Sequence, residues 1–112
     1  MKIRLNYSVF LFALIALIES DAKEGSDTWS AYHGQKKWIS ANSICVGLGL
    51  RLPTIDELKA ASRTGETYSW KEAGLFYWSS TPDGKLYYVL GKSIGNVSSA
   101  NPSGSNDFRC IK

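Results

Sequence analysis

Hydrophobic and polar positions divide the chain into an apolar leader, a helical stretch and a β-rich second half. Residues 9–18 are almost all apolar, and they follow a short basic end that contains Lys2 and Arg4. About ten apolar residues are too few to span a bilayer. Together with small residues up to Ala22, the run is typical of a signal peptide, residues 1–22. An uncleaved membrane anchor is the alternative.

After the leader, the pattern predicts one short strand and then a helix. Apolar and polar residues alternate over residues 28–32, which indicates a strand that ends at Gly34. Over residues 35–46, Trp38 and Cys45 recur at helical spacing, so we expect both to face the interior.

A second helix is predicted directly after Pro53. Thr54 and Glu57 form a capping box, in which each side chain accepts the backbone N–H of the other residue. Ile55 and Leu58 then begin the buried stripe of the helix.

From Thr64 onward the chain is rich in Gly, Ser, Thr, Asn and aromatic residues, which predicts short strands. The strand candidates are residues 76–79, 86–90, 94–98 and 108–111. Two turn dipeptides, Gly91-Lys92 and Gly95-Asn96, leave the register of the middle hairpin open. Residues 98–106 are predicted to form a surface loop.

Length and charge limit the organisation and the partners. Residues 23–112 number about ninety, which is enough for one domain and too few for a second core. The net charge is +3, and Lys36-Lys37 is the only basic doublet among them. Because no stretch interleaves several basic residues with aromatics, we expect no nucleic-acid partner.

The two cysteines, Cys45 and Cys110, are predicted to form a disulfide because cysteines of an exported chain usually pair. Closing so long a loop contributes roughly 4 kcal/mol in the chain-entropy model. Two free thiols or a redox pair are the alternative, but the sequence contains no Cys-x-x-Cys.

Four separated motifs occur in an order that resembles one bacterial family. They are Lys37-Trp38-Ile39-Ser40-Ala41 followed by Cys45, Leu50-Arg51-Leu52-Pro53-Thr54 with Glu57-Leu58, Tyr77-Trp78-Ser79-Ser80-Thr81, and Arg109-Cys110-Ile111. Together they resemble the C-type-lectin-like domains named after the C-terminal domain of a Legionella collagen-like adhesin. The resemblance covers nearly all of residues 29–112. Leu50 departs from it, because the family usually has tryptophan there.

The resemblance implies an α+β, C-type-lectin-like fold. Such a fold has two helices and a small, mostly antiparallel twisted sheet, is closed by one long disulfide, and places the first and last strands side by side. Folding alone also explains several motif residues, so we expect structural roles for Trp38, Glu57 and Trp78.

The function that the resemblance implies is an exported, non-catalytic binding module. Adhesin-like recognition of a glycan or of a protein partner is the first hypothesis, and a structural or envelope-associated protein without a small ligand is the second. An enzyme related to the formylglycine-generating oxidases ranks third, because such enzymes need reactive cysteines and here both are predicted to be paired. His33 has no other ligand at metal-binding spacing.

Aromatic residues supply the candidate site. The chain has more of them than a core of this size is expected to hide, and those predicted to be exposed are Tyr68, Trp70, Tyr77, Tyr87 and Tyr88, with Lys71, Lys85 and Lys92 nearby. Aromatic faces beside lysines suit stacking on sugars or capture of a partner. The candidate ligand-binding residues are Tyr68, Trp70, Lys71 and Asn106. The opposite interpretation, in which Tyr68 and Trp70 pack the loop onto the body, stays open.

No cofactor is expected, and calcium is the alternative. Asn106-Asp107 resembles the Asn-Asp pair that precedes the last cysteine in calcium-dependent lectins, and carboxylate and amide oxygens suit calcium. Those lectins add a Glu-Pro-Asn or Gln-Pro-Asp tripeptide well upstream, whereas this chain has Asn101-Pro102-Ser103 only a few residues before, with no carboxylate. Asn106 and Asp107 are therefore weak candidate metal ligands, and they are expected to shape the turn before the last strand.

Overall fold

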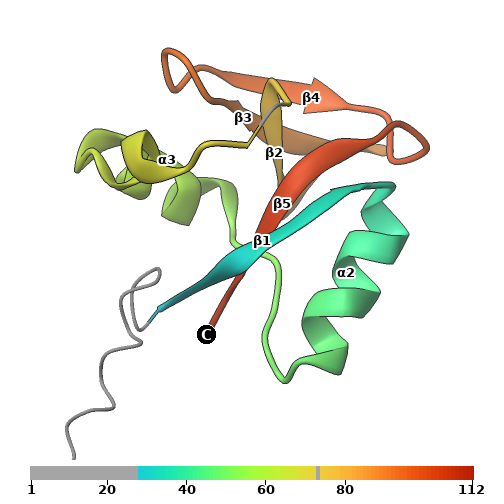
Figure 1. Cartoon of the computed structure of the whole chain (residues 1–112). Coiled ribbons are helices and arrows are strands. Elements are labelled where there is room, and N and C mark those ends of the chain that lie inside the picture. The colour runs from blue at the N-terminus through green and yellow to red at the C-terminus, as the bar shows by residue number, and fades with distance from the viewer. Residues whose placement is uncertain (1–27, 73) are drawn as a thin grey trace, which may run out of the picture.

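The computed structural model describes residues 28–72 and 74–112, and the predicted signal segment lies outside these residues. Figure 1 shows helices packed against a sheet. In chain order the elements are β1 (Trp29–Lys36), α2 (Trp38–Gly47), α3 (Ile55–Arg63), the 3-10 helix η2 (Glu66–Ser69), β2 (Phe76–Asp83), β3 (Leu86–Gly91), β4 (Val97–Ala100) and β5 (Asn106–Ile111). In this part of the chain, none of the helices has the length and apolar character needed to cross a membrane.

The sheet has five strands in the order β1-β5-β2-β3-β4. β5 is antiparallel to β1 and parallel to β2, and the other neighbours are antiparallel. The first and last strands lie side by side (Figure 1). The predicted α+β class, with two helices and a mostly antiparallel sheet, is confirmed.

The two faces of the sheet carry two separate cores, because successive side chains of a strand point to opposite faces. On the face toward α3, one core joins Trp29, Leu58, Ala61, Trp70, Tyr77, Leu90 and Ile111. On the face toward α2, the other joins Ala41, Cys45, Leu52, Trp78, Val89, Phe108 and Cys110. In β5 this alternation sends Asp107 and Arg109 to the α3 face.

The disulfide between Cys45 and Cys110 is confirmed, and it joins α2 to β5 with a Cα–Cα distance of 5.5 Å. The indole N–H of Trp78 donates to the carbonyl of Lys36 at 2.7 Å. Trp38 stacks on Tyr87 with ring centroids 3.9 Å apart. Both tryptophans therefore pack as the structural interpretation of the motifs predicts.

The strand before α2 is longer than predicted. Tyr32 pairs with Arg109, and Gln35 pairs with Asp107. Between these two pairs, β1 therefore contains one residue more than β5. Gly34 has a φ of +97°, which glycine adopts without steric cost. It forms a bulge instead of an end, and the prediction that α2 begins at residue 35 is wrong, because it begins at Trp38.

The capping box of α3 is present as predicted. The Thr54 hydroxyl accepts from the Glu57 N–H at 3.1 Å, and Glu57 Oε1 accepts from the Thr54 N–H at 2.8 Å. Both carboxylate oxygens of Glu57 also accept from the Arg51 guanidinium at 2.8 Å. The hydrogen bond to Arg51 is the main reason that the pKa of Glu57 falls to about 2, against the opposing effect of burial.

The second half departs from prediction at the turn after β3. We expected a strand over residues 94–98, but β4 begins only at Val97 and the Ile94 side chain is 82% exposed. Gly91 donates its N–H to the Asn96 carbonyl at 2.7 Å, and Gly95 closes the turn with a φ of +70°. Residues 94–96 therefore belong to the turn, although β-propensity alone predicts that they belong to the strand.

Candidate functional site

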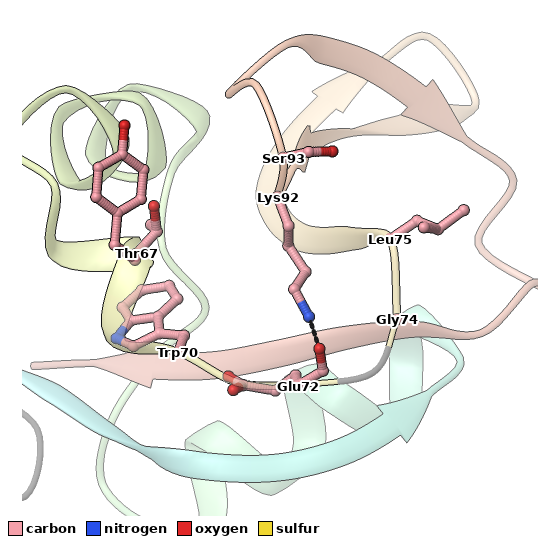
Figure 2. Close-up of a pocket in the computed structure, with 8 residues that line it drawn as sticks. Thr67, Trp70, Glu72, Gly74, Leu75, Lys92 and Ser93 are labelled. Atoms are coloured by element: carbon pink, nitrogen blue, oxygen red, sulfur yellow. Dashed lines mark hydrogen bonds between the residues drawn. The ribbon is translucent and has the colours of Figure 1, made fainter.

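A cavity of about 550 Å³ opens on the α3 face between η2 and the turn after β3. Figure 2 shows Thr67 and Trp70 on one side, and Leu75, Lys92 and Ser93 on the other. Both walls come from irregular segments that are fixed to regular elements. The Lys92 N–H donates to the Leu75 carbonyl at 3.0 Å, which joins the turn after β3 to the segment that leads into β2.

Tyr68 and Leu75 form the apolar rim of the cavity. Their side chains are 75% and 74% exposed, respectively. Tyr68 lies in η2, which follows the left-handed residue Gly65, and its N–H donates to the Gly65 carbonyl at 3.1 Å. The predicted exposure of Tyr68 is therefore confirmed, and its ring is free to meet a ligand.

Trp70 lines the same cavity but is only 6% exposed, so the expectation of an exposed Trp70 is wrong. Its ring makes edge-to-face contacts with Trp29 at 5.0 Å and with Tyr77 at 5.1 Å. The Arg109 guanidinium lies 4.8 Å from its ring centroid. The interpretation in which Trp70 packs the loop onto the body is correct.

The other predicted aromatics are also covered to differing degrees. Tyr77 is fully buried, against expectation, while Tyr87 and Tyr88 are half-buried. Lys85 and Lys92 lie just beyond opposite ends of β3, so they do not share one site as the sequence suggested. The aromatic surplus is absorbed by ring-on-ring packing, which a count of residues cannot foresee.

Two candidate residues do not line the cavity. Lys71 is exposed and follows Trp70 directly. Asn106 is the first residue of β5, where it pairs with Lys36 of β1. A ligand contact by either residue stays a prediction.

Glu72 lines the cavity and forms a buried ion pair with Arg109 that the sequence did not predict. Its Oε2 accepts from the Arg109 Nε at 2.6 Å and from the Tyr77 hydroxyl at 3.0 Å. Burial alone would raise the pKa of Glu72, but the hydrogen bond and charge of Arg109 lower it overall. Burial, and then the charge of Glu72, raises the pKa of Tyr77. Arg109 also donates to the Ser30 carbonyl at 3.1 Å, which ties the pair to β1.

Asp107 is the second buried carboxylate. Its Oδ1 accepts from the Tyr32 hydroxyl at 2.8 Å, and its Oδ2 lies 3.6 Å from the Lys92 ammonium. The pKa of Tyr32 is raised to about 12. Burial is the largest cause, and the hydrogen bond to Asp107 is the second. Lys92 also donates to the Glu72 backbone carbonyl, as Figure 2 shows. Asp107 is thus held inside the protein and does not shape a surface turn.

The segment over Asp107 must be glycine at its closest point. A side-chain carbon on Gly74 would come within 2.4 Å of Asp107 Oδ2 and 2.7 Å of Gln35 Nε2. Gly74 therefore lies directly against the carboxylate. The only signal in the sequence was the spacing of Asp107 and Arg109, two residues apart on one face of the last strand.

The donor set around Asp107 does not fit calcium. Calcium takes six or more oxygens, while the two Asp107 oxygens face a tyrosine hydroxyl and an ammonium. The upstream Asn101 side chain accepts from the Ser103 N–H at 2.9 Å and serves its own turn. Among residues 28–72 and 74–112, there is no group of three or more His, Cys, Asp or Glu side chains that could hold a metal ion. A metal-free site stays a prediction.

Comparisons with known proteins do not assign the chain. No protein-family model matches it, and no curated protein matches it.

Proposed function

We propose that the protein is an exported, non-catalytic binding module that holds a glycan in the cavity between η2 and the turn after β3. One observation carries the proposal: a largely exposed aromatic ring, Tyr68, lines the same cavity as the polar side chains of Lys92 and Ser93. An aromatic face beside hydrogen-bonding groups is what a sugar ring needs, because one face of the sugar is apolar and its edge carries hydroxyls.

The polar wall suits hydroxyls better than a single strong anion. Lys92 has three N–H donors, of which one is used by the Glu72 carbonyl and one faces Asp107. The Lys92 ammonium also lies 5.5 Å from the Tyr77 ring centroid, so the exposed Ser93 hydroxyl is the group proposed to meet sugar oxygens. The charge beneath the cavity is balanced, because Arg109 pairs with Glu72 and Lys92 with Asp107.

The wider assignment rests on the order of the sequence motifs. We propose that the chain belongs to the C-type-lectin-like family named after the adhesin domain, and the pairing of β1 with β5 supports this proposal. The disulfide and the apolar leader support export, because disulfides persist in oxidising compartments. No cofactor is needed for the binding proposed here.

A structural or envelope-associated protein without a small ligand is the second candidate. The packing of Trp70 and Tyr77 favours it, since these aromatics serve the core and leave one large ring at the rim.

A glycan array tests the proposal with three proteins: the parent, a Tyr68→Ala/Leu75→Ala variant, and an Ile39→Ala/Leu48→Ala control. The control removes two exposed apolar side chains on and just after α2 that do not line the cavity. We expect the parent and the control to bind the same glycans, and the Tyr68→Ala/Leu75→Ala variant to lose at least tenfold in affinity, about the effect of one lost stacking contact or two. A parent that binds no glycan would favour the structural alternative. Equal binding by all three proteins would move the site to another face.

A further inference from the structure

A buried carboxylate needs a counter-charge, and Asp107 has one that belongs to the chain itself. The Asp107 side chain is fully buried, and its Oδ2 has no hydrogen-bond partner among the described residues. An isolated charge in such a place would cost several kcal/mol in stability. The cation nearest to it in the described ion pairs is the Lys92 ammonium, 3.6 Å from Oδ2.

The surroundings of the Lys92 ammonium are those of a bound cation. It contacts a backbone carbonyl, that of Glu72, and faces a carboxylate oxygen of Asp107. It also lies 5.5 Å from the centroid of the Tyr77 ring, whose face attracts positive charge. A carbonyl and a carboxylate are the ligand types that a hard metal ion would take.

We propose that Lys92 is a tethered cation: its ammonium fills the cation position beside Asp107 and makes a metal ion there unnecessary. Lys92 is thereby a positioning residue, because its ammonium holds the loop before β2, at Glu72, beside Asp107 of β5. Its backbone N–H binds the same loop at Leu75. This inference goes beyond glycan binding and does not depend on it.

The proposal also explains why the loop can lie so close to a charged group. Gly74 passes over Asp107 at a distance that leaves no space for a side chain. The Lys92 side chain arrives from the cavity wall, where it remains 17% exposed.

Double-mutant analysis tests the pairing in the absence of any ligand. The proteins are the parent, Lys92→Met, Asp107→Asn, the double variant, and Lys85→Met as a control for loss of an exposed lysine in the turn between β2 and β3. We expect Lys92→Met to lower Tm by roughly 10 °C or more, because it leaves a buried carboxylate unpaired. The double variant should regain at least half of that loss, and Lys85→Met should leave Tm within about 2 °C of the parent. Purely additive losses would overturn the pairing.

A second measurement asks whether the position accepts a free cation. Lys92→Ala removes the atoms that propylammonium contains, so propylammonium chloride should raise the Tm of this variant more than the same concentration of sodium chloride. It should not do so for the parent or for Lys92→Met, in which the space is filled. If Lys92→Ala does not fold, recovery of folded protein on adding propylammonium is the readout.

A third measurement asks whether calcium binds at this position. The Tm of the parent should be the same with millimolar calcium as with a chelator. A rise with calcium, or the same response to propylammonium in all variants, would overturn the tethered cation. Neither result would bear on glycan binding at Tyr68, which the array tests separately.

Discussion

Single residues at this site differ mainly in how many partners hold them. Tyr68 and Trp70 are two positions apart and of similar character in the sequence, yet one is 75% exposed and the other 6%. The difference comes from Trp29 and Tyr77, which make edge-to-face contacts with Trp70, and from Arg109, whose guanidinium lies over the Trp70 ring. Tyr68 therefore contributes to a surface, and Trp70 to the core beneath it.

Alanine substitution should separate these two roles. Trp70→Ala should lower the free energy of unfolding by about 3–5 kcal/mol, because it removes a large buried ring. Tyr68→Ala should change it by less than about 0.5 kcal/mol, as is usual for an exposed side chain. Urea unfolding of the two variants and the parent measures both values. Similar losses in the two variants would contradict the assignment of Trp70 to the core.

Elements that are fixed by local chemistry were predictable, and those fixed by tertiary contacts were not. The capping box at Thr54 and Glu57 involves neighbours in sequence, so α3 begins where the pattern predicted. The bulge at Gly34 depends on pairing with β5, more than seventy residues later, and the start of β4 at Val97 depends on a turn. Helical periodicity and β-propensity contain no information about either contact.

The start of α3 also makes stability depend on pH. The pKa of Glu57 is about 2 in the folded protein, below its ordinary value of 4.5. A lowered folded pKa stabilises the protein above the ordinary value, and this stabilisation is lost as the pH falls toward 2. We expect the free energy of unfolding to fall more steeply between pH 5 and pH 2 in the parent than in Glu57→Gln. Denaturant unfolding at several pH values measures it, and equal slopes would contradict a charged contact at this helix end.

At the scale of the whole molecule, the two faces of the sheet carry different features. The disulfide belongs to the α2 face, and the cavity belongs to the α3 face. Cys45 and Cys110 close the α2 face, where the motif tryptophan Trp78 packs. The α3 face carries the ion pairs and the cavity. The sequence predicted the disulfide, the α+β class and Tyr68, because pairing of two cysteines and exposure of a loop ring need little tertiary knowledge. It missed the ion pairs of Glu72 and Lys92, which lie in segments without periodicity that only the folded sheet brings together.

The most direct test of the account is an NMR titration of the ¹⁵N-labelled protein with a glycan that binds on the array. Amide shifts report where a ligand sits without requiring any substitution. The account predicts that the largest shifts fall on Tyr68, Leu75 and Ser93, around the cavity, and that they persist with a chelator present. Shifts centred on α2, or binding that disappears with the chelator, would contradict it.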